Sequence, residues 1–162
     1  MKIKTGIGYD VHQFARPEDD RKCILGGVDI PHPVGLQGHS DADVLSHAIA
    51  DAVLGALGLP DIGYYFPPTD ASIEGICSLE ILVKCRALLE EKHGKLQNID
   101  STIIAEAPKV LPHLNSMKQK LAEALGIVTE DIGIKATTNE TMGFVGRKEG
   151  IAAMATCCII ID

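Results

Sequence analysis

The sequence predicts an α+β fold, a roughly four-stranded mixed sheet with helices packed on one face. Three observations predict it. Strand-like and helix-like segments alternate along the 162 residues, a Gly-Gly pair near the start indicates a short inserted hairpin, and the last strand-like segment, residues 151–161, is apolar on both faces. The length is that of one domain, so we expect residues 1–162 to form a single domain.

The first elements follow from local patterns. Residues 1–12 alternate between two sets of side chains, which predicts a strand, and the polar residues 13–22 indicate a surface loop. Gly26-Gly27 joins two short strands as a hairpin. Residues 44–57 carry an apolar stripe at helical spacing, which predicts a helix from residue 40 to residue 59 with Ser40 as N-cap and Asp43 in a capping-box position.

The remaining elements alternate in the same way. Residues 61–70 have no clear period and form either a binding loop or a plain connector. A second helix is expected with Ser78 as its N-cap and His93-Gly94 at its end, followed by a strand over 96–105 and a third helix from Pro112 to Gly126. Strands over 132–137 and 151–161 then flank a glycine-containing loop.

The last strand also predicts an assembly. If helices cover only one face of the sheet, the apolar residues on the other face of 151–161 would be exposed to water. No segment of the sequence remains to cover them. We therefore expect a homo-oligomer that packs sheet against sheet with cyclic symmetry.

Composition excludes some classes of function. The net charge is −7, only 4% of residues are aromatic, and tryptophan is absent, which argues against nucleic-acid binding. The sequence contains no run of 18 apolar residues, so it predicts no membrane-spanning helix. The five cysteines are odd in number and form no CxxC motif, which favours free thiols in a reducing, cytoplasmic setting, with Cys157 and Cys158 as small core residues.

Three residues could form a metal site. Asp10 and His12 project from the same face of the first strand, and His47 lies on the first helix between Asp43 and Asp51 at four-residue spacing. An Asp/His/His set suits zinc, and an open fourth position would make it catalytic. The alternatives are an Asp–His hydrogen bond at a strand end, a hydrogen-bonded core histidine, or Asp43 as a ligand.

Three loops could bind phosphate. Residues 136–140 offer hydroxyls and backbone donors at a strand end, residues 143–147 offer glycines and an arginine, and residues 107–109 offer a lysine. Glu140 would repel a phosphate unless a divalent cation such as Mg²⁺ or Mn²⁺ bridges the two. The residues alone therefore point to a metal-dependent enzyme acting on a phosphate or diphosphate.

Taken together, the motifs closely resemble those of the 2-C-methyl-D-erythritol 2,4-cyclodiphosphate synthase family, over nearly the whole chain. The combination is highly specific, although no single motif is. The matching segments are Asp10-Val11-His12, residues 39–44 (HSDADV), 61–63 (DIG), 66–70 (FPPTD), 107–109 (APK), 136–140 (ATTNE) and 143–150 (GFVGRKEG).

The resemblance implies a cyclodiphosphate synthase domain, a phosphorus–oxygen lyase of non-mevalonate isoprenoid biosynthesis. Such an enzyme converts 4-diphosphocytidyl-2-C-methyl-D-erythritol 2-phosphate into 2-C-methyl-D-erythritol 2,4-cyclodiphosphate and CMP. The resemblance also implies a homotrimer with active sites between neighbouring subunits. Asp10, His12 and His47 match the zinc ligands, which leaves Asp41 and Asp43 as capping groups and Asp51 as a candidate to support a ligand.

Further roles are implied by the same resemblance. His39 and Thr138 match residues that stabilise the transition state, and Glu140 matches the ligand of a second divalent ion, Mg²⁺ or Mn²⁺. The implied substrate contacts are Asp10, Val11, His12, His39 and Ser40; Asp61, Ile62 and Gly63 at the ribose; Phe66, Pro67, Pro68, Thr69 and Asp70 at the methylerythritol; Ala105, Glu106, Ala107, Pro108, Lys109, Val110, Leu111, Ala136, Thr137, Thr138, Asn139 and Glu140 at the cytidine diphosphate, from the next subunit; and Phe144 and Arg147.

The sequence departs from the family pattern at two positions. Ala42 stands where the family usually has glycine, and Asn139 where it has a third threonine. Two other functions fit the same residues less well. A metal-dependent phosphohydrolase would use a water nucleophile and release an open-chain phosphate, and a trimeric binding module would close its metal site with four protein ligands.

Overall fold

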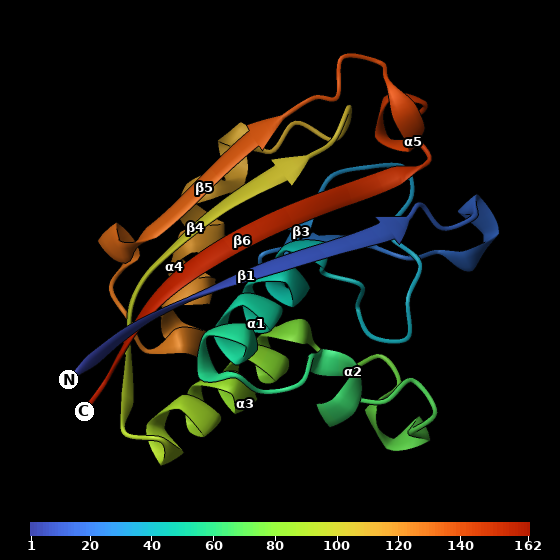
Figure 1. Ribbon diagram of the computed structural model, residues 1–162. Helices are drawn as coiled ribbons and strands as arrows, with labels where there is room; N and C mark the ends of the chain where they lie inside the picture. The colour runs from blue at the N-terminus through green and yellow to red at the C-terminus, as the bar shows by residue number, and fades with distance from the viewer.

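The computed structural model describes residues 1–162, and its main feature is a four-stranded mixed sheet with three long helices on one face (Figure 1). The strand order is β1-β6-β4-β5; β6 is antiparallel to β1 and β4, and β4 is parallel to β5. This confirms the predicted fold class. The strands are β1 (Lys2–Gln13), β4 (Gly94–Ile104), β5 (Ile132–Thr137) and β6 (Gly150–Ile161), and the long helices are α1 (Val44–Leu57), α3 (Ser78–Glu91) and α4 (Leu114–Leu125).

The predicted hairpin is present as a separate two-stranded sheet. It consists of β2 (Cys23–Leu25) and β3 (Val28–Ile30), and both turn residues, Gly26 and Gly27, have positive φ. The remaining elements are short: α2 (Ile62–Tyr65), α5 (Gly143–Gly146), and the 3₁₀ turns η1 (Pro17–Asp19), η2 (Ala71–Ile73), η3 (Leu111–His113) and η4 (Thr129–Asp131). No helix is both long and apolar enough to span a membrane.

The N-cap of α1 is Asp43, not Ser40 as predicted. One oxygen of the Asp43 carboxylate accepts the Ser46 amide at 3.0 Å and the Gly26 amide at 2.9 Å, and the other accepts the Gly27 amide at 2.7 Å. The Asp43 carboxylate thus accepts hydrogen bonds from the backbone amides of both the hairpin turn and the helix start. Ser40 lies before the helix, where its hydroxyl accepts the amide of Ala42.

The start of α3 also differs from the expectation. Ser78 is the first helical residue rather than the cap, and Cys77, at the cap position, makes no side-chain hydrogen bond. The carboxylate of Asp41 accepts the Ser78 amide at 3.0 Å, so the cap comes from a distant part of the chain. The helix ends at Glu91, two residues before the predicted terminus.

Two glycines bring α1 against β1. Gly6 and Gly8 face the helix, and a Cβ on either would overlap a backbone carbonyl, that of Ala52 or Ala48. The two backbones therefore lie closer than any other residue would allow. Within α1, every residue except Asp51 and Gly55 is buried.

The opposite face of the sheet carries apolar side chains that the chain itself does not cover. Ile3, Ile7 and Tyr9 of β1 are 67%, 64% and 52% exposed, and Met154 of β6 is 43% exposed. Cys158, which was expected in the core, is on this face and only half-buried, because its neighbour Cys157 takes the helix-covered side.

The Gly8 contact gives a direct test of the packing. We expect Gly8→Ala to lower the free energy of unfolding by about 3 kcal/mol, because the methyl group must push α1 away from β1. Gly55→Ala is the matched control: its methyl group would meet only the Ile7 carbonyl, at 3.7 Å, and should stabilise the helix by up to about 1 kcal/mol. Urea unfolding of both variants measures the difference, and equal effects would contradict the assignment.

Candidate metal centre

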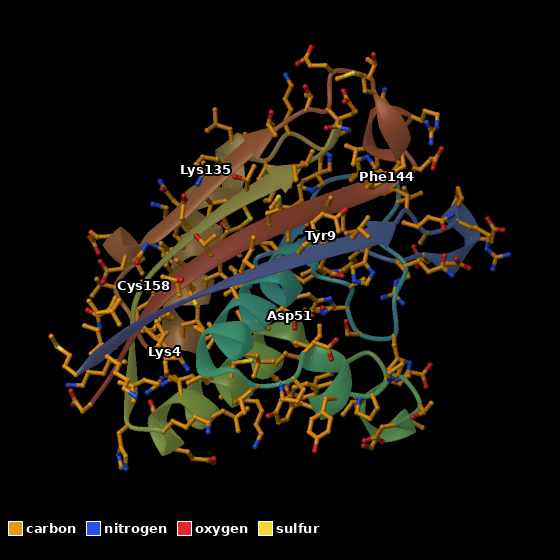
Figure 2. The ribbon with its side chains drawn as sticks, in the orientation of Figure 1. Lys4, Tyr9, Asp51, Lys135, Phe144 and Cys158 are labelled. Atoms are coloured by element: carbon orange, nitrogen blue, oxygen red, sulfur yellow. The ribbon has the colours of Figure 1, made fainter.

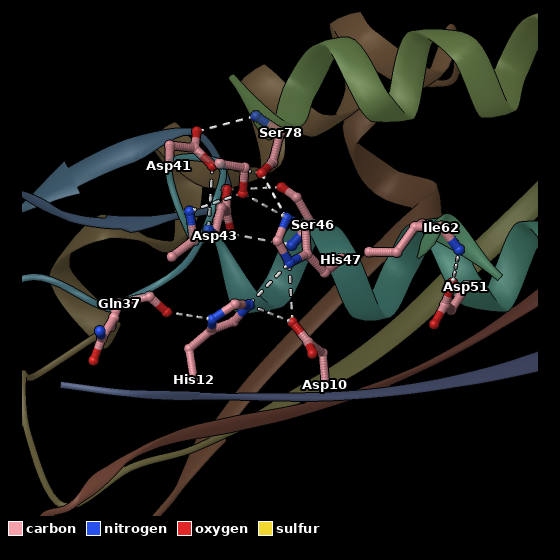
Figure 3. A network of polar contacts seen from close by, with 12 residues as sticks. Asp10, His12, Gln37, Asp41, Asp43, Ser46, His47, Asp51, Ile62 and Ser78 are labelled. Atoms are coloured by element: carbon pink, nitrogen blue, oxygen red, sulfur yellow. Dashed lines mark hydrogen bonds and ion pairs between the residues drawn. The ribbon is translucent and has the colours of Figure 1, made fainter. Parts of the chain in front are cut away.

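Three side chains from β1 and α1 converge on one point. His12 Nε2 and His47 Nδ1 each lie 3.0 Å from the same oxygen of Asp10, and the two nitrogens lie 3.1 Å apart (Figure 3). These atoms form a nearly equilateral triangle on the helix-covered side of the sheet. The structure therefore brings together the Asp/His/His set that the sequence predicted.

The triangle suits a tetrahedral metal ion. Ligands at about 2.0–2.1 Å from zinc lie about 3.3 Å from one another, slightly farther apart than the distances seen here. The other ring nitrogens are also placed for binding. His12 Nδ1 is 2.7 Å from the carbonyl oxygen of Gln37 and His47 Nε2 is 2.8 Å from Ser78 Oγ, so each ring turns its remaining nitrogen toward the centre.

The electrostatics are those of a cation site. Burial alone would raise the pKa of Asp10, but hydrogen bonds from His12 and His47 outweigh it and lower that pKa to about 2. Burial works against a charged His12, yet the hydrogen bond to Asp10 raises the pKa of the imidazole. The carboxylate thus stays ionised and draws positive charge to the centre of the triangle.

Two acidic residues that flank His47 in sequence are not part of the triangle. Asp43, the rival ligand, is fully buried and bonds to the hairpin and the helix start. Asp51, which was expected to support a ligand, instead accepts the Ile62 amide at 2.9 Å. It therefore connects α1 to the segment that carries the predicted ribose contacts.

A cavity of about 270 Å³ opens beside the triangle. It brings together nine of the predicted site residues and three isoleucines that sequence reasoning missed. The isoleucines could not be singled out, because Ile73 and Ile76 lie between residues 70 and 78, where the sequence predicts no element, and Ile81 reads as an ordinary core residue of α3. The lining consists of Asp10, His12, His39, Ser40, His47, Ile62, Gly63, Phe66 and Pro68, with Ile73, Ile76 and Ile81.

Other predicted residues of this region lie around that cavity. Asp61 caps α2 through the Tyr64 amide, and Asp70 caps η2 through the Ser72 amide. His39 Nε2 is 3.2 Å from the backbone oxygen of Asp70. Pro67 and Thr69 belong to the same connector and do not line the cavity.

A second group of predicted residues forms a separate cavity of about 290 Å³ at the other edge of the sheet. It is lined by Pro108, Lys109, Val110, Leu111, Pro112, Ala136, Thr137 and Thr138. Ala105 is buried, and Ala107 directly precedes Pro108 in the chain; neither lines the cavity.

Hydrogen bonds hold the loop after β5 in place. Glu106 accepts the Asn139 amide at 2.9 Å and the Thr141 amide at 3.2 Å. Thr138 donates its hydroxyl to Glu140 at 2.9 Å. The Asn139 side chain donates to the backbone oxygen of Met142, so this departure from the family pattern has a local structural role.

Residues near the carboxyl ends of β1 and β5 line the two cavities, and these strand ends lie at the same end of the sheet but on its opposite edges (Figure 1). Val11 pairs with Ala152, Ala152 with Ile104, and Ile104 with Thr137, which makes one row across the four strands. Three strand spacings separate the ends of that row by roughly 14 Å. Within one chain, the structure therefore does not bring Thr138 and Glu140 to the metal triangle.

Three predicted contacts lie away from both cavities. Val11 points to the uncovered face of the sheet, where it lines a third cavity of about 520 Å³ with Tyr9 and Phe144. Figure 2 shows Tyr9 on β1 and Phe144 on α5 at the same end of the molecule. Arg147 forms an ion pair with Glu149 at 2.6 Å.

Ala42 occupies a position that favours glycine. Its φ is +58° and it is fully buried. An alanine in the left-handed region costs about 1 kcal/mol, which gives a physical reason for the glycine of the family pattern.

Comparison with known proteins identifies the family. The model of the YgbB family matches residues 3–160. The chain belongs to the YgbB family. A protein of Akkermansia muciniphila named 2-C-methyl-D-erythritol 2,4-cyclodiphosphate synthase is 57% identical over 99% of this chain and 94% of its own length.

Solved structures agree with this assignment. The Plasmodium falciparum IspF in complex with CDP is 32% identical, with a TM-score of 0.85 over 99% of this chain and 97% of that one. The bifunctional IspDF of Campylobacter jejuni is 39% identical, with a TM-score of 0.93 over 99% of this chain. The chain spans 43% of that longer protein.

Removing one imidazole tests the metal site. We expect His47→Ala to abolish zinc binding while the protein stays folded, because two ligands on one strand cannot hold the ion alone. His113→Ala, which removes an imidazole at the start of α4, is the control and should bind zinc normally. Metal analysis after dialysis against zinc, with circular dichroism, measures both; normal zinc content in His47→Ala would exclude this residue as a ligand.

Proposed function

We propose that the protein is a 2-C-methyl-D-erythritol 2,4-cyclodiphosphate synthase, a single domain over residues 1–162. The observation that carries the proposal is the Asp10/His12/His47 triangle beside a cavity, in a chain that is 57% identical to a protein of that name. The substrate is 4-diphosphocytidyl-2-C-methyl-D-erythritol 2-phosphate. The products are the 2,4-cyclodiphosphate and CMP, and the enzyme acts as a phosphorus–oxygen lyase in non-mevalonate isoprenoid biosynthesis.

The reaction is an intramolecular phosphoryl transfer. An oxygen of the 2-phosphate attacks the β-phosphorus, the bond from that phosphorus to the CMP oxygen breaks, and CMP leaves with the electron pair. The protein supplies no nucleophile, so its contribution is to hold the two phosphates in line and to stabilise the added charge. A bound zinc ion supplies Lewis acidity at the phosphate oxygens.

The chain's own residues position the substrate. His39 and Ser40 lie in the cavity beside the triangle, where they would donate hydrogen bonds to phosphate oxygens. Ile62 and Gly63 line the same cavity and, with Asp61, would hold the ribose. Phe66 and Pro68 supply apolar contacts for the methylerythritol.

The β5 edge of the sheet would supply the nucleotide pocket and the ligand for a second metal ion. Residues 105–111 and 136–140 would enclose the cytidine diphosphate, with Thr138 stabilising the transition state. One oxygen of Glu140 accepts the Thr138 hydroxyl, which leaves the carboxylate's other oxygen for Mg²⁺ or Mn²⁺. Phe144 and Arg147 would add further contacts.

A homotrimer would complete the site. The metal half lies at the β1 edge and the nucleotide half at the β5 edge, so a head-to-tail ring would join the β1 edge of one subunit to the β5 edge of the next. The same ring would bury the exposed Ile3, Ile7 and Met154.

The five free cysteines support a cytoplasmic location.

The direct test is turnover of the named substrate. We expect incubation with zinc and Mg²⁺ to yield CMP and a cyclic diphosphate, both resolved by phosphorus NMR, because attack by the 2-phosphate closes a ring. A phosphohydrolase would give an open-chain phosphate instead. A binding module with a structural metal would retain the substrate without turnover, and either result would overturn the proposal.

A mixing experiment tests the intersubunit site. We expect His47→Ala and Thr138→Ala each to be inactive alone, and their co-refolded mixture to recover about a quarter of wild-type activity, because random assembly leaves about one site in four with both halves intact. A mixture of His47→Ala with Asp10→Ala is the control and should stay inactive, since both changes lie in one half. No recovery in the first mixture, with hybrid trimers confirmed, would mean that one chain supplies the whole site.

A further inference from the structure

Ser78 contacts a metal-ligand candidate from outside the predicted site. It is the first residue of α3 and is fully buried, and its Oγ lies 2.8 Å from His47 Nε2 (Figure 3). Nε2 is the ring nitrogen that faces away from Asp10 and His12. The sequence offered Ser78 only as a helix cap, a role that the structure does not give it.

The hydrogen bonds of Ser78 have a defined direction. Its hydroxyl donates to the carboxylate of Asp41, which can only accept. The Ser78 oxygen therefore accepts from His47 Nε2, so a metal ion that displaces the hydrogen bond between Nδ1 and Asp10 would find the proton on Nε2 and a bare Nδ1 facing Asp10 and His12. A metal ion needs that bare Nδ1.

Asp41 is itself held from two sides. Its carboxylate accepts the Ser78 amide at 3.0 Å and the Asp43 amide at 3.2 Å. Both amides belong to helix starts, that of α3 and that of α1. The position of the carboxylate is therefore fixed independently of His47.

Ser40 is the competing acceptor for the same proton. Its Oγ lies 3.2 Å from His47 Nε2, compared with 2.8 Å for Ser78, and it already accepts the Ala42 amide at 3.1 Å. One N–H serves one strong acceptor, and the shorter contact is with Ser78. The Ser40 hydroxyl hydrogen then remains available to the cavity.

We propose that Ser78, held by Asp41, is a positioning residue that fixes the tautomer and orientation of His47 for metal binding. The inference rests on the proposed zinc site. His12 reaches the same end by a different route, because its Nδ1 donates to a backbone carbonyl, that of Gln37. His47 is thus the ligand whose orientation depends on a replaceable side chain.

Zinc affinity tests the proposal. The measurement is competition for zinc between the protein and a chromogenic chelator at one neutral pH. We expect Ser78→Ala to weaken zinc binding about tenfold, since losing the partner of a metal-bound histidine has effects of this size. Asp41→Asn should weaken it in the same direction but less, because the amide keeps an oxygen for Ser78 and loses the charge.

Ser46→Ala is the matched control. Ser46 is also a buried serine that donates to a buried carboxylate, that of Asp43, at 2.7 Å, but its side chain makes no hydrogen bond to the metal triangle of Asp10, His12 and His47. It should lose stability without losing zinc affinity. If Ser78→Ala does not fold, Asp41→Asn carries the test against the same control.

A spectroscopic measurement separates positioning from general packing. In the zinc-loaded protein, the Nε2 proton of His47 should resonate downfield and exchange slowly in the wild type and in Ser46→Ala. It should shift upfield and exchange faster in Ser78→Ala. If Ser78→Ala keeps the zinc affinity of the wild type and the resonance of the Nε2 proton is unchanged, the role of Ser78 is overturned while the proposed metal site stands. If the wild-type protein binds no zinc, the proposed metal site is overturned as well.

Discussion

The close contact between α1 and β1 is the constraint on which the candidate site depends. Gly6 and Gly8 let the helix backbone rest on the strand, and this places His47 of the helix within 3.1 Å of His12 of the strand. A larger side chain at either glycine would separate the two elements and with them the ligands. The alanines that α1 turns toward the strand serve the same purpose from the other side.

A second level of order comes from two carboxylates just before α1. Asp43 joins the β2–β3 turn to the start of α1, and Asp41 joins the start of α3 to the same segment. The buried carboxylate of Asp43 and the half-buried carboxylate of Asp41 lose contact with water and are stable because their oxygens are hydrogen-bonded, so both loops are held in one arrangement. The hairpin and both helices therefore meet behind His47 and hold the candidate metal site in one arrangement.

The sequence could predict most of this fold but not how its parts meet. Local patterns such as a glycine pair, an apolar period or a helix terminator depend only on neighbours in the chain. The hairpin, the end of α4 at Gly126 and the strands could therefore be predicted from the sequence. The predicted cap of α1 was wrong because Asp43 is held at the cap position by hydrogen bonds from the amides of Gly26 and Gly27, which are distant in sequence. Likewise, the alternating pattern of β1 predicts two faces, but it does not predict which of them packs against the helices. In the structure it is the face that carries Gly6 and Gly8. The triangle was predicted from spacing and family resemblance; Ser78 was missed because only tertiary contact joins it to His47.

Net charge explains why metal ions are central to the proposed chemistry. The chain carries a charge of −7, and the substrate is anionic. Near the sites, Arg147 pairs with Glu149, and the other nearby cations are Lys109 and Arg21, whose guanidinium donates to the Ser40 backbone oxygen. With zinc bound, two neutral imidazoles and one carboxylate would give the proposed site a net charge of +1, and Glu140 alone would do the same for Mg²⁺. In the proposed enzyme, an acidic protein would thus present two cationic centres to a diphosphate, and carrying them on opposite edges of the sheet would keep like charges apart until subunits assemble.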